Sequence, residues 1–441
     1  MVKVITYGTY DLLHYGHIKL LERAKALGDY LIVGVTSDDF DKRRGKINVQ
    51  QSLMERIEGV RSTGLADEII VEEYEGQKID DIKRLDVDIF AIGSDWKGHF
   101  DYLEEYCKVV YLPRTEGISS SELRTEERKT RIGLTGESSV LRKYYNECSY
   151  VNGMDVEAIY TENSATREEY SKLTVDSYDS LLEKVDSVYI VANPSKHYQF
   201  IKKALEKGKH VLCESPITLS ESETKELFDL ARKNNLILME ALKTAYATAY
   251  SRLLLLLKGG KIGKILSVDS TCTSLKNIDP TNIGNTWNSI CAWGPTAMLP
   301  IFNLLGTDYS NVQLTSLYLD KNKKFDSFTK ADFEYPDAVA SFKVGKGVKS
   351  EGELIVTGTL GYAYVPAPWW KTDYFEIRYE NPADNKRYFY QLEGEGIRYE
   401  IVAFLKSIES QRLMSYIDEN ISEAISHVIE KYYDGEVNEL K

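Results

Sequence analysis

The chain has 441 residues, which is too long for a single compact module and predicts two to four domains. Its 55 Lys and Arg residues against 68 Asp and Glu residues give a formal net charge of −13. This balance argues against a nucleic-acid partner, because affinity for phosphate backbones depends on clustered cationic side chains. With 43% hydrophobic and 28% charged residues, the composition is that of an ordinary globular protein and not of a disordered one.

The cysteines, the opening segment and the lengths of the apolar runs indicate in which cellular compartment the protein is found. Five cysteines, odd in number and far apart, indicate reduced thiols rather than a disulfide framework or a zinc site. The opening segment MVKVI is strand-like and lacks the pattern of a secretory leader. The longest apolar run, 253–257, is far shorter than the roughly 20 residues that span a bilayer. We therefore expect a cytoplasmic protein without membrane insertion.

The first 123 residues alternate short apolar runs with amphipathic stretches. Buried strands are expected at 2–6, 31–36, 89–92 and 109–112. Between the first two, Ile18, Leu21 and Ala24 recur at helical spacing before Gly28, which offers a left-handed stop. The alternation predicts an α/β domain over 1–123 with a parallel sheet flanked by helices. The mixed-charge segment 124–130 is expected to be a linker.

Two further domains are predicted after the linker. The second, 131–245, is expected to be another doubly wound α/β domain, with strands at 131–135, 157–160, 188–191 and 210–213. The third, 246–441, shows longer alternating stretches and amphipathic helices, at 265–273, 338–344, 397–410 and 421–433. This pattern predicts an α+β domain with an open sheet.

The first motif, GTYDLLHYGH at 8–17, follows the first predicted strand directly. It runs into a helix, whose N-terminal N–H groups form a ready site for a phosphate. His14 and His17, with Gly16 between them, can place both imidazoles on one side of the turn while the backbone comes close to a ligand. Such a pair suits nucleotidyl transfer, in which donors meet negative charge on the α-phosphate. Two surface histidines are the weaker interpretation, because the chain has only six histidines.

This motif resembles the GTFDLLHxGH signature of the glycerol-3-phosphate cytidylyltransferases, within the nucleotidyltransferase superfamily that carries the HxGH motif. Further segments of the first domain are similar to the same family: LLERAKALGDYLIVGV at 20–35, IFAIGSDW at 89–96 and VVYLPRTEGISS at 109–120. The resemblance implies a Rossmann-like nucleotidyltransferase domain that uses CTP.

The resemblance also implies a role for each matching residue. His14 and His17 would stabilise the pentavalent transition state at the α-phosphate, and Lys46 would pair with substrate phosphates unless it is only a solvated surface lysine. The remaining matches would form the nucleotide and phosphate pocket: Gly8, Thr9, Tyr10, Gly16, Asp95, Trp96, Arg114, Thr115, Ser119 and Ser120. For the two serines, plain helix capping is an equal alternative. Arg61 is a further match, in a divergent segment.

The expected reaction joins CTP and a polyol phosphate to give a CDP-polyol and pyrophosphate. By family resemblance the acceptor is glycerol 3-phosphate, but residues 48–65 diverge from the family pattern, so a related acceptor such as glycerol 2-phosphate stays open. Mg²⁺ is implied as the metal complex of CTP, with no protein ligand to the metal. The product would feed the synthesis of a bacterial cell-wall or capsular polymer.

The rest of the chain resembles the Gfo/Idh/MocA oxidoreductases, which combine a dinucleotide-binding Rossmann domain with a sheet-rich domain. Four segments carry this resemblance: VYIVANPSKH at 188–197, GKHVLCESP at 208–216, GKIGKI at 260–265 and GTLGY at 358–362. An NAD(P)-dependent dehydrogenase half would be the direct implication.

Three changes argue against hydride transfer and against NAD(P) as a cofactor. The glycine-rich stretch keeps Gly136 but has Ser138 where the fingerprint requires glycine. Ser215 replaces the lysine of the family's EKP motif, and a hydroxyl supplies no fixed positive charge. Thr296 stands where a His or Tyr proton donor is expected.

Several alternatives stay open for this half. It could be a dehydrogenase in a bifunctional enzyme, or a module for binding and oligomerisation only, and we expect a homo-oligomer. Trp369 and Trp370 are either interface or core. His197 either serves a ligand pocket or is a packed, hydrogen-bonded histidine.

Overall fold

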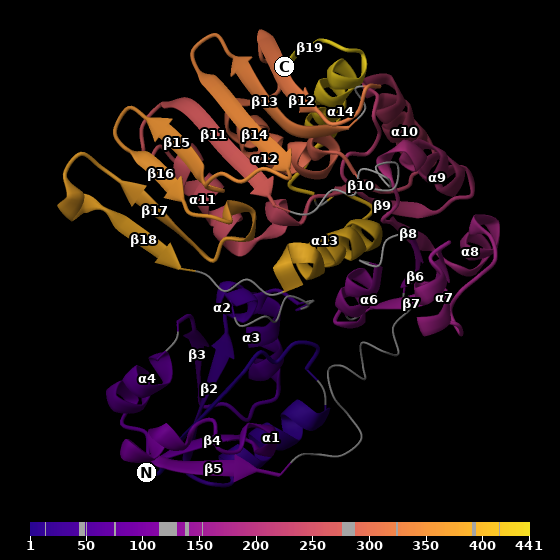
Figure 1. Cartoon of the computed structure of the whole chain (residues 1–441). Coiled ribbons are helices and arrows are strands. Elements are labelled where there is room, and N and C mark those ends of the chain that lie inside the picture. The colour runs from indigo at the N-terminus through magenta and orange to yellow at the C-terminus, as the bar shows by residue number, and fades with distance from the viewer. Residues whose placement is uncertain are drawn as a thin grey trace. The chain divides into compact units, whose positions relative to one another are not determined.

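The computed structural model describes the chain except residues 14, 44–48, 50, 75, 114–129, 137–140, 152, 276–286, 323–324, 390–393 and 414. Contacts among the described residues divide the chain into two compact units, Met1–Lys129 and Thr130–Lys441 (Figure 1). The expected linker at 124–130 falls outside the described residues except for Thr130, which begins a strand. In the described part of the chain, no helix is long and apolar enough to cross a membrane.

The described residues of the first unit form a five-stranded sheet in the order β3-β2-β1-β4-β5, with every neighbouring pair parallel. The strands are β1 (Lys3–Gly8), β2 (Tyr30–Thr36), β3 (Glu68–Glu72), β4 (Ile89–Gly93) and β5 (Lys108–Leu112). The predicted parallel α/β fold is confirmed. The sequence analysis missed β3, whose EIIVE segment begins and ends with a charged residue.

Alternating side chains place a core on each face of this sheet. Val4 and Leu31 face one core, whereas their neighbours Ile5 and Ile32 face the other, as the period of two in a strand requires. The helices that cover these faces are α1 (Tyr15–Lys25), α3 (Leu53–Ser62), α4 (Gln77–Leu85) and the short η2 (Asp101–Glu105). Two further short helices, α2 (Asp38–Arg43) and η1 (Ser94–Trp96), follow the carboxyl ends of β2 and β4.

In the second unit, the described residues contain a second five-stranded parallel sheet in the order β10-β9-β8-β6-β7. Its strands are β6 (Thr130–Thr135), β7 (Met154–Tyr160), β8 (Ser187–Ile190), β9 (His210–Glu214) and β10 (Leu238–Ala241). The helices between them are α6 (Leu141–Ser149), α7 (Ser164–Glu169), α8 (Tyr178–Lys184), α9 (Pro194–Glu206) and α10 (Glu221–Lys233). This is the doubly wound fold that the sequence predicted.

His197 is a packed histidine of this fold. It is fully buried on α9, with Nδ1 2.8 Å from the carbonyl oxygen of Pro216 and Nε2 2.9 Å from that of Ala192. Both ring nitrogens therefore contact main-chain oxygens, which favours the structural interpretation over the ligand pocket.

The remaining described residues form a mixed nine-stranded sheet in the order β18-β17-β16-β15-β11-β14-β13-β12-β19. The strands are β11 (Ile265–Ser274), β12 (Asn311–Tyr318), β13 (Asp326–Glu334), β14 (Val339–Lys346), β15 (Leu354–Gly358), β16 (Tyr362–Val365), β17 (Tyr374–Arg378), β18 (Lys386–Phe389) and β19 (Val437–Glu439). Burial alternates along β12 and β13, so one face of the sheet is packed and the other is more open. The predicted α+β open-sheet architecture is confirmed.

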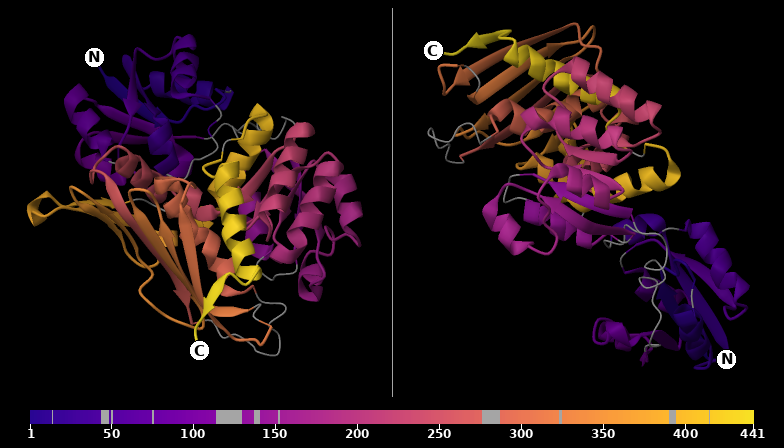
Figure 2. Two further views of the ribbon diagram at one scale, coloured as in Figure 1. Left: turned by 90° about the horizontal axis from the view of Figure 1, so that it is seen from above. Right: turned by 90° about the vertical axis from the view of Figure 1, so that its right-hand side faces the viewer.

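Helices pack on the buried face of this sheet (Figure 2). Helix α12 (Ser289–Leu305) lies against β11 and β14, and α14 (Glu419–Tyr433) packs on α12 and α10. The other helices are η3 (Lys243–Tyr246), α11 (Thr248–Lys258), η5 (Trp369–Lys371), η6 (Pro382–Asp384), η7 (Gly394–Gly396) and α13 (Ile397–Ser410). Trp369 and Trp370 are buried at 0% and 8% exposure, which places both indoles in the core of this unit.

Candidate functional site

The GTYDLLHYGH segment lies at the carboxyl edge of the first sheet. β1 and β4 are neighbours there, with β2 and β3 on one side and β5 on the other, so the edge between them is the switch point at which open α/β sheets bind ligands. Gly8 and Thr9 leave β1 at this edge, and Asp95 and Trp96 leave β4 beside them. Gly16 and His17 lie in the first turn of α1. Six further predicted site residues fall outside the described residues: His14, Lys46, Arg114, Thr115, Ser119 and Ser120.

The buried ring of Tyr10 packs against the imidazole of His17. The Tyr10 ring is 1% exposed and meets the His17 imidazole edge-on, with 5.5 Å between the ring centroids. A Cβ atom at Gly8 would come within 3.0 Å of the Tyr10 ring, so glycine there leaves the space that the ring occupies. Burial raises the pKa of the Tyr10 hydroxyl, which keeps it neutral. This placement favours a role for Tyr10 in positioning His17, in the first turn of α1, rather than in direct contact with a nucleotide.

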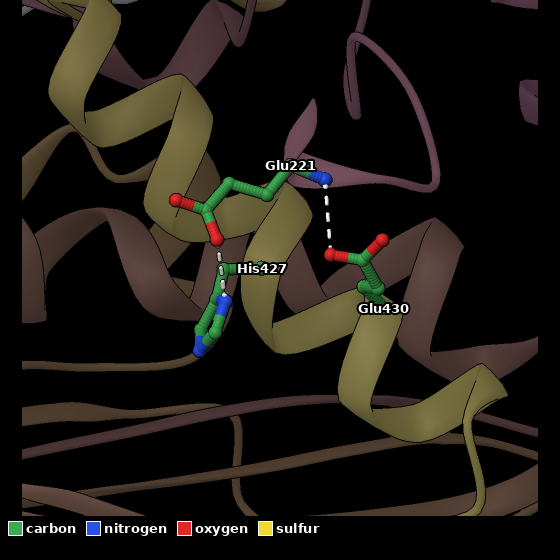
Figure 3. Close-up of side chains that lie close together, drawn as sticks. All are labelled: Glu221, His427 and Glu430. Atoms are coloured by element: carbon green, nitrogen blue, oxygen red, sulfur yellow. Dashed lines mark hydrogen bonds and ion pairs between the residues drawn. The ribbon is translucent and has the colours of Figure 1, made fainter. Parts of the chain in front are cut away.

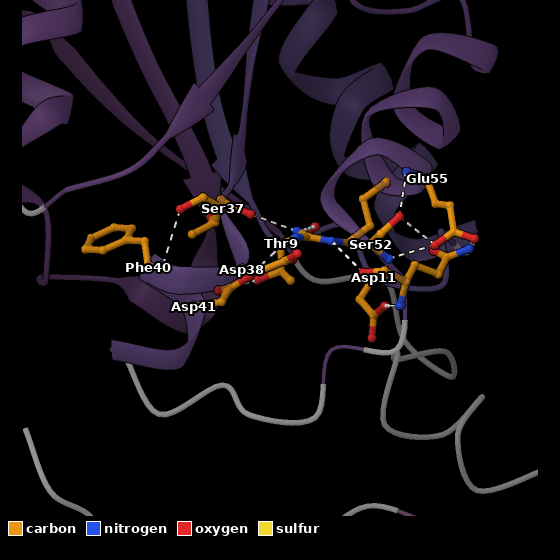
Figure 4. A network of polar contacts seen from close by, with 11 residues as sticks. Thr9, Asp11, Ser37, Asp38, Phe40, Asp41, Ser52 and Glu55 are labelled. Atoms are coloured by element: carbon orange, nitrogen blue, oxygen red, sulfur yellow. Dashed lines mark hydrogen bonds and ion pairs between the residues drawn. The ribbon is translucent and has the colours of Figure 1, made fainter. Parts of the chain in front are cut away.

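Hydrogen bonds tie the start of the motif to helix α2 and to Gln51, just before α3 (Figure 4). The Thr9 hydroxyl donates to the buried Asp41 carboxylate at 2.9 Å. Asp11 Oδ1 accepts a hydrogen bond from the main-chain N–H of Gln51 at 3.0 Å, and Gln51 Oε1 accepts one from the N–H of Leu12 at 2.8 Å. These reciprocal bonds fix the backbone that leads into α1.

Arg56 is a central residue of this network that the sequence analysis missed. Its side chain is fully buried on α3, and its Nη1 donates to the carbonyl oxygens of Thr9 at 2.7 Å and Thr36 at 2.8 Å. Its Nε donates to the carbonyl oxygen of Gln51 at 3.1 Å, and it pairs with the Asp38 carboxylate. One guanidinium therefore joins the ends of β1 and β2 to the loop before α3.

Arg61, the residue that the resemblance suggested, lies elsewhere on the same helix. Its side chain is 60% exposed and pairs with Glu58, one turn earlier. The structure therefore brings Arg56 to the motif and leaves Arg61 on the solvent face. Arginine is usually exposed, and each of these two is adjacent to a core residue, Ile57 or Val60, so the sequence carried no signal that distinguished them.

Asp95 and Trp96 lie at the carboxyl end of β4, the strand next to β1. They lie in η1, immediately after β4, and both are exposed, Trp96 at 37%. The Trp96 indole meets the His99 ring edge-on at 5.7 Å, which leaves part of the indole accessible. An accessible aromatic face at this edge of the sheet is suited to contact a nucleobase.

In the second unit, Gly136 is required by packing alone. A Cβ atom there would lie 2.3 Å from the main-chain oxygen of Val191, because the ends of β6 and β8 approach closely. The adjoining Ser138 falls outside the described residues. The glycine that survives from the dinucleotide fingerprint is therefore explained without a ligand.

Two of the altered dehydrogenase positions, Ser215 after β9 and Thr296 on α12, lie among the described residues. The Ser215 hydroxyl is buried and donates to Glu240. Thr296, on α12, offers a hydroxyl that does not titrate near neutral pH. Glu214 accepts hydrogen bonds from Tyr144 and Tyr189, and burial raises the pKa of this carboxyl group. Ser215 and Glu214 are therefore held by hydrogen bonds within the unit, and the Ser215 hydroxyl does not supply the fixed positive charge of a lysine.

One group of three possible metal-ligating side chains occurs among the described residues, Glu221, His427 and Glu430 (Figure 3). His427 Nδ1 lies 2.7 Å from Glu221 Oε2. Glu430 accepts hydrogen bonds from the Ser220 hydroxyl at 2.7 Å and from the N–H of Glu221 at 3.3 Å, so it caps the N-terminus of α10. These contacts join α10 to α14 and account for the arrangement without a metal ion.

The comparisons with known proteins assign the first unit. Residues 5–126 match the family described as cytidylyltransferase-like. The glycerol-3-phosphate cytidylyltransferase of Bacillus spizizenii is 53% identical over 126 residues, which are 29% of this chain and 97% of that protein. The chain belongs to the cytidylyltransferase-like family. Its first unit is a nucleotidyltransferase domain, as the GTYDLLHYGH motif predicted.

The second unit of this cytidylyltransferase-like chain is similar to oxidoreductases. Residues 130–242 match the oxidoreductase family with an NAD-binding Rossmann fold. A dTDP-3,4-didehydro-2,6-dideoxy-alpha-D-glucose 3-reductase from Streptomyces violaceoruber is 32% identical over 153 residues, 33% of this chain and 45% of that protein. A 3-ketoreductase from Actinomadura kijaniata, solved with NADP and TDP-benzene, shares the fold at a TM-score of 0.62 and 18% identity, covering 71% of this chain and 99% of that one.

Proposed function

We propose that the protein joins CTP and glycerol 3-phosphate to form CDP-glycerol and pyrophosphate. The observation that carries this proposal is the GTYDLLHYGH segment at the carboxyl edge between β1 and β4, with His17 supported by the buried Tyr10 ring. The names of relatives such as the Bacillus spizizenii protein support the choice of acceptor. A related polyol phosphate, such as glycerol 2-phosphate, is the alternative acceptor.

The reaction is a direct displacement at phosphorus. An oxygen of the acceptor phosphate attacks the α-phosphorus of CTP and forms a new P–O bond. The bond from that phosphorus to the oxygen that bridges to the β-phosphate breaks, and pyrophosphate leaves with the electron pair. Mg²⁺ enters as part of the CTP complex and spreads the charge on the triphosphate.

The proposed contribution of the protein is positioning and charge stabilisation. His14 and His17 would donate hydrogen bonds to the α-phosphate oxygens, on which charge develops in the transition state, and Lys46 would neutralise the phosphates. Arg56 fixes the carbonyl of Thr9, at the start of the turn that must approach the phosphates. A turn held in this way needs no reorganisation during the reaction, which is how a preorganised site lowers the barrier.

We propose that the second unit catalyses no hydride transfer and acts in ligand binding or assembly of a homo-oligomer. The observation that supports this is the hydrogen bond from Ser215 to Glu240 at the position of the family's lysine. The product, made in the cytoplasm of a bacterium, would serve as an activated building block for a cell-wall or capsular polymer.

The acceptor is tested by incubating the full chain with Mg²⁺, CTP and either glycerol 3-phosphate or glycerol 2-phosphate, and by following the products with phosphorus NMR. The expected result is a diphosphate diester signal with glycerol 3-phosphate, and none when the acceptor is omitted. If the diester forms only with glycerol 2-phosphate, that compound is the acceptor in place of glycerol 3-phosphate. Formation of no diester with either acceptor would contradict the proposal.

A further inference from the structure

Among the described residues of the second unit, three lysines from separate elements meet at one carboxylate. Lys243 of η3 and Lys143 of α6 both contact Glu395 Oε2, with 2.8 Å between Lys243 Nζ and that oxygen. Lys371 of η5 lies 2.7 Å from the other oxygen, Oε1. We call these four side chains the lysine cluster. Because two ammonium groups share one oxygen, the three positive charges are close together.

The lysine cluster has more positive charge than its own carboxylate can balance. Three ammonium groups and one carboxylate leave a formal surplus of +2, in a chain whose net charge is −13. Burial and the neighbouring charges of Lys243 and Lys371 lower the pKa of Lys143. Although burial acts in the opposite direction, hydrogen bonds from the three lysines hold the pKa of Glu395 well below its usual range. The charge of Lys243 also acts on the carboxyl groups of Glu214 and Glu400, but burial raises the pKa of both and favours their neutral, protonated forms. These two groups therefore offset little of the surplus, which favours a further anion.

The lysine cluster is partly exposed to solvent, and two of its lysines lie on elements that are hydrogen-bonded to each other. The lysine side chains are 28–38% exposed and that of Glu395 is 34% exposed, so a small molecule can reach them. Thr244, next to Lys243, donates a hydrogen bond to the carbonyl of Trp370 at 3.1 Å, and Trp370 precedes Lys371. Two of the three lysines therefore belong to elements that are tied to each other in the core.

The lysine cluster also lies near the ligand-binding edge of the second sheet. The positive charges of Lys243 and Lys143 act on Glu214, the last residue of β9. The carboxyl ends of parallel strands are where open α/β sheets bind their ligands. This position makes a ligand site a better explanation than a solvated surface ion pair.

The Glu395 carboxylate occupies the position between the lysines that an anionic ligand would take. Its φ is +52°, a left-handed conformation that non-glycine residues rarely adopt, between Gly394 and Gly396. This backbone places a two-oxygen anion among three ammonium groups. A phosphate group carries up to two charges and three terminal oxygens, and so matches three lysines better than a carboxylate does.

We propose that Lys143, Lys243 and Lys371 bind the phosphate group of a small phosphate ester or diphosphate, which displaces the Glu395 carboxylate. The three lysines and Glu395 all belong to the second unit, so the proposal does not depend on the function proposed for the first unit. It gives the second unit a ligand without requiring a redox reaction.

The first test measures the stoichiometry of pyrophosphate binding to the full chain by calorimetry. We expect the double variant Lys243→Gln/Lys371→Gln to bind one pyrophosphate fewer per chain than the natural protein. The matched control is Lys264→Gln, which removes an exposed lysine paired with Asp337 in the same unit and should bind as many as the natural protein. Equal stoichiometry in the natural protein and the double variant would overturn the proposal.

The second test uses Glu395→Gln and does not require loss of any lysine. If Glu395 occupies the position of a ligand phosphate, the neutral amide competes less, and pyrophosphate should bind to the lysine cluster about tenfold more tightly. If the four side chains are only a structural ion cluster, this variant should lose thermal stability and gain no affinity, and that outcome would refute the site. Inorganic phosphate and glycerol 3-phosphate, titrated in parallel, show whether a diphosphate or a monoester is preferred.

Discussion

The Arg56 guanidinium donates a hydrogen bond to the main-chain carbonyl of Thr9 at 2.7 Å. A fully buried side chain of α3 thus holds the residue at which the GTYDLLHYGH turn leaves β1. Loss of this group would leave the carbonyls of Thr9 and Thr36 and the buried carboxylate of Asp41 with fewer partners in a site that water reaches poorly.

Arg56 and Arg61 form a matched pair for mutation. Arg56→Ala is expected to lower the free energy of unfolding of the first unit by about 3 kcal/mol and to abolish turnover, because a buried charge network loses its cation. Arg61→Ala, which removes only an exposed ion pair with Glu58, is expected to change stability by less than about 0.5 kcal/mol. Urea denaturation of both variants measures the difference, and equal effects would contradict the assigned roles.

His17→Ala tests the proposed catalytic role. Turnover is expected to fall by about 100- to 1000-fold, because a hydrogen bond to the charge of the transition state is lost. The affinity for CTP should fall much less, since that contact strengthens only during the reaction. Lys19→Ala, on the same helix, removes an exposed ion pair with Glu22 and serves as the control. Parallel losses of turnover and CTP affinity in His17→Ala would assign His17 to binding alone.

The alternation of apolar runs predicted the fold because buried strands of a parallel sheet are continuous apolar segments. Runs at 2–6 and 188–191 correspond to β1 and β8 within a few residues. The short β3 was missed because the apolar run in EIIVE is only three residues long, so its assignment as a strand depends on pairing with β2. Propensity alone does not detect a strand that tertiary pairing creates.

The motif predicted the candidate site, but not the residues that hold its backbone. His17, Gly8 and Thr9 lie where the spacing predicted, after a strand and into a helix. Arg56 could not be chosen over Arg61, because both are arginines on one short helix and only burial separates them. The lysine cluster could not be predicted either, because its lysines are distant in sequence and meet only in the folded chain: Lys143, Lys243 and Lys371.

Asp326 should make the stability of the second unit depend on pH. Burial raises the pKa of Asp326 to about 6, although the carboxylate accepts hydrogen bonds from Thr329 and from the N–H groups of Ile290 and Ser289. An unfolded aspartate titrates near about 3.9, so the folded state binds this proton more tightly. The stabilising contribution is therefore complete at low pH and is lost as the pH rises through about 6.

The matching variant is Asp326→Asn, which does not titrate. The melting temperature of the natural protein minus that of the variant is expected to be larger at about pH 5 than at about pH 7.5, because only the natural protein gains stability on protonation. Other titrating groups cancel in this difference. Thermal unfolding at the two pH values checks it, and a difference that is independent of pH would show that Asp326 keeps its charge in the fold.

The second unit is expected to be silent with nicotinamide cofactors. Ser215 is hydrogen-bonded to Glu240, and Thr296 does not titrate near neutral pH. The full chain should therefore oxidise neither NADH nor NADPH when ketone or aldehyde sugars are supplied as substrates. Calorimetric titration of both cofactors should show no binding in the micromolar range. Tight binding or cofactor oxidation would favour the bifunctional enzyme instead.

The central claim is most directly tested by measuring pyrophosphate release with CTP, Mg²⁺ and glycerol 3-phosphate, for the full chain and for residues 1–129 in parallel. The shorter segment is a fair comparison, because it is a compact unit and the Bacillus spizizenii relative consists almost entirely of the matching domain. The account predicts release by both proteins, dependent on the acceptor and lost in His17→Ala. Absence of release from the full chain with every polyol phosphate tested would contradict it.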